Sequence, residues 1–176
     1  MAQNLFNQYC RQEADTTALA QKLALGLSHL FQADQSIHLN ISLEGDLGAG
    51  KTTFARHLIQ ALGYAGRVKS PTYTLCEPYP IEIYSGNPSS AVNITAHHFD
   101  LYRMRDPLEW QEAGFAEHFD EPGFCLVEWP GKAEGTLPAF DIEIHLRAGE
   151  DEGARNISLQ ANTRHGIAVI EELLPQ

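Results

Sequence analysis

The chain has 176 residues and a formal net charge of −11, and 43% of its residues are hydrophobic. This length favours one domain, spanning residues 1–176, that is large enough to form its own core. The negative charge opposes non-specific binding to a phosphate backbone, so a partner would make most contacts with any RNA. The three cysteines form no CxxC pair, and the sequence has neither a secretory leader nor a membrane span. We therefore expect a cytoplasmic protein without a zinc or redox pair of cysteines.

The first third of the chain predicts a helix, a strand, a tight turn and a second helix. Leucines recur at helical spacing from Thr16 or Thr17 to Phe31. The alternation over Ile37–Leu43 predicts a strand, and the apolar spacing over Lys51–Leu62 predicts a helix. The glycine-rich turn between the last two elements has the size of a phosphate-binding loop.

The rest of the chain predicts short strands separated by loops. The stretch Tyr79–Asn93, rich in Pro, Gly, Ser and Asn, predicts a surface loop or a loose hairpin tip. Helices are expected from Pro107 to about Gly114 and over Gly166–Leu174. Strands are expected at Arg67–Lys69, Tyr73–Glu77, Ile94–Leu101, Gly123–Val127, Asp141–Arg147 and Arg155–Gln160. This mixture favours an α/β fold of the P-loop NTPase type, a three-layer sandwich whose mixed sheet has a parallel core, antiparallel additions and flanking helices.

The segment Gly45–Thr52 (GDLGAGKT) fits the phosphate-loop pattern G-x-x-x-x-G-K-[ST]. Its glycines permit close approach of main-chain N–H groups to phosphate oxygens in front of a helix N-terminus. Lys51 would lie over the β- and γ-phosphates, and the Thr52 hydroxyl would bind Mg²⁺. The predicted nucleotide-binding residues are Gly48, Ala49, Gly50, Lys51, Thr52 and Thr53.

Two carboxylates at strand ends are candidates to act beside this loop. Glu128 follows an apolar strand and is the better candidate for a second metal ligand, direct or through water. Asp100 is interpreted as a group that orients water or the metal shell, with a salt bridge to Arg103 or Arg105 as the alternative. Trp129 either covers the site or belongs to the core.

Two further sets of polar residues lie near the phosphate loop in the expected fold. Ser70, Pro71 and Thr72 form a polar segment in the position of a nucleotide-sensing loop, although Ser-Pro-Thr is also an ordinary turn. We interpret His97, His98 and His118 as supporting or surface groups rather than metal ligands.

Taken together, four segments resemble the TsaE (YjeE) family of bacterial P-loop ATPases, which act in making the threonylcarbamoyladenosine modification of tRNA. The similarity runs over most of the chain, and the segments occur in the order of the family. They are Gly45–Thr53 (GDLGAGKTT), Lys69–Leu75 (KSPTYTL), His98–Arg103 (HFDLYR) and Leu126–Pro130 (LVEWP).

The resemblance implies a role for several residues. It makes Thr52 and Glu128 the Mg²⁺ ligands, Asp100 an essential residue beside the catalytic Lys51, and Ser70–Thr74 a mobile switch-like loop. It also implies that Trp129 is the family's conspicuous tryptophan. ATP would be the substrate, and its slow hydrolysis would reset a TsaD–TsaB complex that carries out the transfer on tRNA.

The four motifs do not identify the contacts to partners or the residues that bind the adenine base. The stretch Pro80–Thr95 is longer than the family pattern leads us to expect, which leaves its contacts to partners open. For the adenine base we expect contacts from Glu13–Thr17 and from Arg155.

Three other functions are compatible with a phosphate loop. A small-molecule kinase would need an acceptor pocket and a basic lid, but the chain has only 12 lysines and arginines and no arginine-rich segment. A GTP switch would need an Asn-Lys-x-Asp motif, which does not occur in the sequence. A nucleotide-sensing subunit with incidental hydrolysis remains open.

Overall fold

The structure is a computed structural model that describes residues 3–71, 73–84, 86 and 88–175. Its strands are β1 (Leu5–Cys10), β2 (His38–Glu44), β3 (Cys76–Ile83), β4 (Val92–Asp100), β5 (Gly123–Glu128), β6 (Ile142–Ala148) and β7 (Arg155–Ala161). Its α-helices are α1 (Glu13–Ala33), α2 (Lys51–Ala61), α3 (Glu109–Glu112) and α4 (Arg164–Glu171). Short 3₁₀ helices are η1 (Pro88–Ser90), η2 (Ala116–Asp120) and η3 (Pro130–Ala133).

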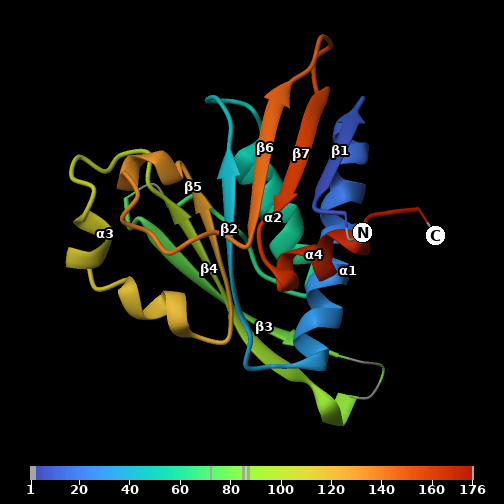
Figure 1. Cartoon of the computed structure of the whole chain (residues 1–176), viewed down its shortest axis with the longest axis horizontal. Coiled ribbons are helices and arrows are strands. Elements are labelled where there is room, and N and C mark those ends of the chain that lie inside the picture. Colours follow the sequence, from blue (N-terminus) through green and yellow to red (C-terminus); the bar gives the residue numbers. More distant parts are fainter. Residues whose placement is uncertain (1–2, 72, 85, 87, 176) are drawn as a thin grey trace.

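The strands form one seven-stranded mixed sheet in the order β1-β7-β6-β2-β5-β4-β3 (Figure 1). β2 runs parallel to β5 and β6, and β4 runs parallel to β5. β1, β3 and β7 pair antiparallel with their neighbours. The expected α/β fold, with a parallel core and antiparallel additions, is therefore confirmed.

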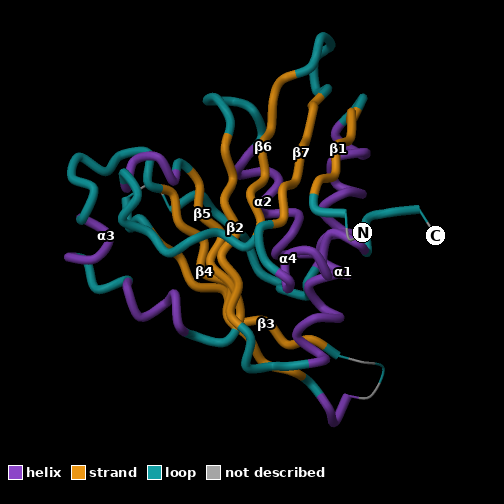
Figure 2. Tube along the Cα trace, viewed as in Figure 1, coloured by secondary structure: helices purple, strands orange, loops and turns teal. Residues whose placement is uncertain are grey.

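Different layers cover the two faces of the sheet. Apolar side chains of α1, α2 and α4, such as Leu23, Phe54 and Val169, form one core with the sheet. Trp110 of α3 and Phe119 of η2 belong to a second core on the opposite face, over β3, β4 and β5. Figure 2 accordingly shows α3 well apart from the other three α-helices. Because side chains alternate along each strand, consecutive residues of β4 and of β5 point to opposite faces of the sheet and pack in different layers.

Several expected element boundaries are wrong. The described part of the chain has no strand at 67–69, and the strand expected at Tyr73–Glu77 begins only at Cys76. The stretch Tyr79–Asn93, expected to be a surface loop or a loose hairpin tip, belongs to a β-hairpin whose strands reach further than expected: β3 extends to Ile83 and β4 starts at Val92. The prolines of β3 are tolerated because β3 is an edge strand, where a missing N–H leaves no ladder partner unpaired.

Two elements at the margins of the sheet also differ from expectation. β1 carries no clear apolar pattern and was not expected; it pairs only with β7 at the other edge of the sheet. The helix expected from Pro107 to Gly114 has one turn, Glu109–Glu112. In the described residues no helix has the length and apolar character needed to cross a membrane.

Candidate functional site

The phosphate loop and both candidate carboxylates meet at one edge of the sheet. The loop follows β2, and the register of the parallel strands pairs Leu43 with Glu128 and Asp100 with Glu128. The carboxyl ends of β2, β5 and β4 therefore lie side by side, which is where ligands bind in parallel α/β sheets. Segments that are far apart in the sequence reach one cleft for this reason.

The loop itself has the backbone geometry that its glycines permit. Gly48 and Gly50 have φ values of 80° and 100°, in the left-handed region that other residues rarely adopt. At Gly45, an added Cβ would lie 2.4 Å from the carbonyl oxygen of Leu146, so a side chain does not fit. The loop leads into α2, whose first main-chain bond runs from Phe54 to the carbonyl of Gly50. The preceding amide groups at the start of α2 are therefore available to a ligand.

A cleft of about 320 Å³ opens in front of this helix end. The first residues of α2 form one wall, and groups from β4, β5 and β7 form the others. Its lining residues are Leu47, Gly48, Gly50, Lys51, Thr52, Thr53, Asp100, Tyr102, Glu128, Trp129 and Arg155. With lysine, hydroxyl and carboxylate groups together, the cleft has the chemistry needed for a polyphosphate and a hard cation.

Lys51 lies at the centre of the loop with only 5% of its surface exposed. Its ammonium group donates hydrogen bonds to the carbonyl oxygens of Gly45 (2.6 Å) and Asp46 (2.8 Å). The same group lies 4.3 Å from the centre of the Trp129 ring, a cation–π distance. Burial lowers the pKa of Lys51, while the nearby carboxylates of Glu128, Asp100 and Asp46 oppose that shift.

Thr52 and Glu128 form an oxygen-rich pair beside Lys51. The Thr52 hydroxyl lies 3.0 and 3.1 Å from the two carboxylate oxygens of Glu128, which is only 2% exposed. His98, fully buried, donates from Nε2 to Oε2 of Glu128 at 2.6 Å. A hydroxyl and a carboxylate held this close fit the oxygen ligands that Mg²⁺ prefers. The His98 contact fixes the carboxylate orientation, as groups behind metal ligands do.

Asp100 faces the same cleft and is held by two hydrogen bonds. Its carboxylate accepts from the Ser70 hydroxyl (3.2 Å) and from the main-chain N–H of Tyr102 (3.1 Å). Burial raises the pKa of Asp100. Arg103, named above as a possible ion-pair partner, has its guanidinium over the Tyr73 ring at 5.0 Å. The expected switch-like segment thus reaches Asp100 through Ser70; Pro71 is buried, and Thr72 lies outside the described residues.

Arg155 contacts the back of the phosphate loop. Its Nε donates to the carbonyl oxygen of Ala49 at 2.7 Å, and Nη2 donates to that of Gly48 at 3.3 Å. A second, smaller cavity of about 130 Å³ lies here. It is lined by Arg155, Ala49 and Gly50 together with Glu13 and Thr16 of α1, among others. The two regions expected to contact the base therefore lie next to each other.

The sequence did not single out His98 as a partner of Glu128 or Arg155 as a support of the loop. His98 could have been found from the sequence. It is two residues before Asp100 on a strand, so the two side chains share a face, and Asp100 was already a candidate. For Arg155 we find no local signal, since its contact with the loop joins β7 to a segment about a hundred positions earlier.

The sheet order, the glycine-rich loop between β2 and α2 and the cleft in front of it define an α/β protein of the P-loop NTPase type. A family model described as "Threonylcarbamoyl adenosine biosynthesis protein TsaE" matches residues 10–157. The chain belongs to the TsaE family, as the resemblance of its four motifs indicated.

Curated relatives and a solved structure agree with this assignment. The tRNA threonylcarbamoyladenosine biosynthesis protein TsaE of Haemophilus influenzae is 43% identical over 130 residues, which are 74% of this chain and 75% of the relative. The protein of the same name from Bacillus subtilis is 38% identical over 134 residues, 76% of each chain. The crystal structure of Bacillus subtilis YdiB superposes with a TM-score of 0.68 at 28% identity and covers 96% of this chain and 93% of that one.

Proposed function

We propose that this protein binds ATP with Mg²⁺ and hydrolyses it slowly, as a step in the threonylcarbamoyladenosine modification of tRNA. The observation that carries the proposal is the cleft in which Lys51, Thr52, Asp100 and Glu128 come together from the phosphate loop and two strand ends. Family membership supports the modification pathway, because the curated relatives are named for it.

Each residue of the cleft has a distinct task in this proposal. The amides after Gly48 and the Lys51 ammonium bind phosphate oxygens and neutralise the charge that builds up during transfer. Thr52 and Glu128 hold Mg²⁺, which supplies further charge neutralisation when bound. Asp100, oriented by Ser70 and Tyr102, positions the attacking water.

The arginine content of the cleft predicts slow ATP turnover by the isolated chain. In the described part of the chain Arg155 is the one arginine that lines the cleft, and its guanidinium is already bonded to loop carbonyls. No arginine in the described lining of the cleft is therefore free to stabilise the transferring phosphoryl group in cis, a role worth roughly 10³–10⁵ in turnover where it is present. We propose that the TsaD–TsaB complex named by the family resemblance completes the site.

The test is phosphate release from ATP by the purified chain, with and without TsaD and TsaB. We expect slow Mg²⁺-dependent release that the two proteins stimulate. Asp100→Asn should retain ATP binding but lower stimulated release by roughly 10²–10³-fold, because it removes the group that positions water. Asp151→Asn, an exposed carboxyl in the β6–β7 turn, is the control and should behave as the wild type. An Asp100→Asn protein with normal release would contradict this role.

The same assay separates the two remaining alternatives. Transfer of label from ATP to a small acceptor, in place of phosphate release, would indicate a kinase. ATP binding without any release, even with both partners, would indicate a sensing subunit. If phosphate release did not depend on Mg²⁺, Thr52 and Glu128 would not have the proposed role of holding the metal.

We further propose that the adenine base lies in the small cavity between Arg155 and the start of α1. Arg155→Ala should weaken ATP binding by roughly 5–20-fold, because the cavity proposed for the base loses one of its lining side chains and the phosphate loop loses two charge-assisted hydrogen bonds. Arg164→Ala makes the same charge change on an exposed face of α4 and should leave affinity unchanged. Fluorescent-nucleotide titration measures both variants, and equal affinities would count against this placement.

A further inference from the structure

The sheet ends in β1 on one side and in β3 on the other, and each of these edge strands pairs with one neighbour. An edge strand can offer unpaired main-chain N–H and C=O groups to another strand. In an antiparallel pair, the main-chain groups of alternate residues point toward the neighbouring strand and away from it. The residues whose groups point outward can therefore be identified at both edges.

The outer edge of β3 is interrupted by prolines. The N–H of Asp100 donates to the carbonyl oxygen of Leu75 at 3.0 Å, in line with the antiparallel register of β3 and β4. Leu75 and every second residue after it therefore direct their main-chain groups toward β4. Pro78 and Pro80 are at the intervening positions, which face outward, and proline has no N–H to donate. Two outward donors are thus missing from this edge.

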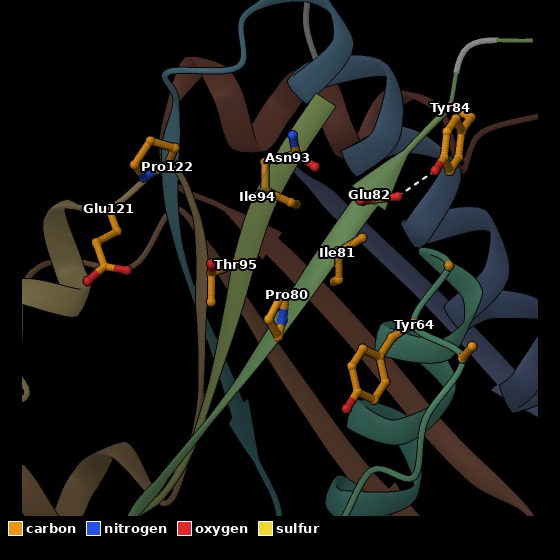
Figure 3. Close-up of a pocket in the computed structure, with 12 residues that line it drawn as sticks. Tyr64, Pro80, Ile81, Glu82, Tyr84, Asn93, Ile94, Thr95, Glu121 and Pro122 are labelled. Carbon is orange, nitrogen blue, oxygen red and sulfur yellow. Dashed lines mark hydrogen bonds between the residues drawn. The ribbon is translucent and has the colours of Figure 1, made fainter. Parts of the chain in front are cut away.

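The segment after α2 also covers the outer edge of β3. The ring of Tyr64 packs edge-on against Tyr79 of β3, with centres 4.9 Å apart, and the Tyr79 hydroxyl accepts from the N–H of Lys69 at 3.1 Å. Figure 3 shows Tyr64 on the side of Pro80 away from β4, beside a groove of about 550 Å³. A further strand cannot extend the sheet at β3 for these two reasons.

The outer edge of β1 carries no such protection. The N–H of Ala161 donates to the carbonyl oxygen of Asn4 at 2.8 Å, in line with the antiparallel register of β1 and β7. Asn4 and every second residue after it therefore face β7, and the main-chain groups of Leu5, Asn7 and Tyr9 point away from the sheet. β1 contains neither a proline nor a charged residue, the two common means of protecting a free edge.

The side chains of the same three residues are exposed on one face of β1. Leu5 is 43% exposed and Tyr9 is 45% exposed, and the Asn7 side chain between them is exposed as well. Asn7 and Tyr9 line a groove of about 450 Å³ together with residues of β6 and β7. The second core layer, which lies over β3, β4 and β5, does not cover this part of the sheet. Two large apolar side chains thus accompany an unpaired strand edge.

The order of these residues makes β1 complementary to itself. If a second copy of β1 lies antiparallel with Asn7 opposite Asn7, Leu5 of each copy lies opposite Tyr9 of the other. All three positions are those whose main-chain groups face outward, so the two strands can form a hydrogen-bonded ladder. The register also forms two aliphatic–aromatic pairs, which stabilise neighbouring strands, and sets two side-chain amides against each other. No charged side chain of β1 opposes this approach, although each copy has a net charge of −11.

We propose that β1 pairs with β1 of a second copy of this chain, in a symmetric antiparallel dimer centred on Asn7. The same patch of each copy forms the interface, as in other two-fold dimers. Gln3, whose side chain donates to the outward carbonyl oxygen of Leu5 at 2.7 Å, releases this acceptor when the strands pair. Strand pairing alone makes a small interface, so we expect a dissociation constant of roughly 10–100 µM. The proposal does not depend on ATP binding.

The test is sedimentation equilibrium of the untagged full chain without nucleotide, at roughly 5–500 µM to bracket the expected constant. We expect the mass to rise from 19.5 kDa toward twice that value as the concentration increases. Amide hydrogen exchange locates the interface. At high concentration the amides of Leu5, Asn7 and Tyr9 should exchange at least about tenfold more slowly, because they become hydrogen-bonded. Those of Phe6 and Gln8 bond to β7 and should be protected at every concentration.

Charge variants at Asn7 test the register. Asn7→Lys and Asn7→Asp each place like charges opposite each other at the two-fold axis, so either variant alone should remain monomeric. An equal mixture of the two should dimerise, because opposite charges then face each other. The Asn7 side chain is exposed and its main chain does not bond to β7, so retained protection of Gln8 will show that each variant keeps the fold. Asn93→Lys makes the same charge change at an exposed position of β4 and should dimerise as the wild type does.

Three results would overturn the proposal. One is a wild-type chain that stays monomeric up to about 500 µM, well above the expected constant. Another is a dimer that Asn7→Lys does not weaken, or one without slower exchange at Leu5, Asn7 and Tyr9, since its interface would then lie elsewhere. The third is a mixture of the two Asn7 variants that remains monomeric, because the two side chains would then not face each other.

Discussion

Replacing Lys51 with methionine should abolish nucleotide-dependent function while leaving the fold intact. The ammonium group is the one cation at the centre of the loop, so its loss should weaken ATP binding by roughly 10–100-fold. Phosphate release should fall by a further factor of roughly 10²–10³, because charge stabilisation of the transferring group is lost. Equilibrium binding and single-turnover release measure the two effects separately.

Folding and function can be separated at this position. Methionine keeps an unbranched side chain that packs on Trp129, and burial already disfavours the charged lysine, as its lowered pKa indicates. We therefore expect the melting temperature to change by less than about 4 °C. Lys22→Ala removes the same charge from an exposed position on α1 and is the control. Normal hydrolysis by Lys51→Met would remove the basis of the proposed function.

The sequence predicted the parts of the site that depend on local geometry. A glycine-rich loop between a strand and a helix is encoded by adjacent residues, so Gly45–Thr52 could be read directly. Glu128 and Asp100 could be found because each ends a strand, and the ends of parallel strands share one edge of a sheet. The order of the strands in the sheet was not predicted, because it depends on contacts between distant segments.

The missed features all depend on such contacts. β3 contains two prolines, and its part from Tyr79 onward was expected to be a surface loop or a loose hairpin tip, but an edge strand tolerates prolines when one neighbour supplies the pairing. The contact of Arg155 with Ala49 joins β7 to the phosphate loop. His97 and His118 were interpreted as supporting or surface groups, and their closeness to Glu121 became visible only once η2 was placed against β4.

Glu128→Gln should eliminate Mg²⁺-dependent hydrolysis even at high Mg²⁺. The amide keeps the shape of the side chain and a hydrogen bond to Thr52, but it removes the anionic ligand. We expect phosphate release to fall by roughly 10²–10³-fold, in line with the loss of a group that stabilises the charge of the reaction. Binding of ATP without Mg²⁺ should persist, because Lys51 and the loop amides are unchanged.

A substitution of His98 should have a weaker effect on the Mg²⁺ requirement than Glu128→Gln. His98→Ala leaves the Glu128 charge in place but removes its 2.6 Å hydrogen bond, so the carboxylate loses its fixed orientation. Loss of such a supporting contact costs roughly 10–100-fold in metal affinity, and higher Mg²⁺ should restore turnover in this variant but not in Glu128→Gln.

The neighbouring pair of Glu44 with His145 supplies the control. It also joins a strand-end carboxylate to a histidine, at 3.1 Å, but Glu44 does not line the cleft. Glu44→Gln should therefore leave the Mg²⁺ requirement unchanged. If all three variants shifted the Mg²⁺ requirement equally, the effect would come from the overall charge of this sheet edge, and Glu128 would not be a ligand.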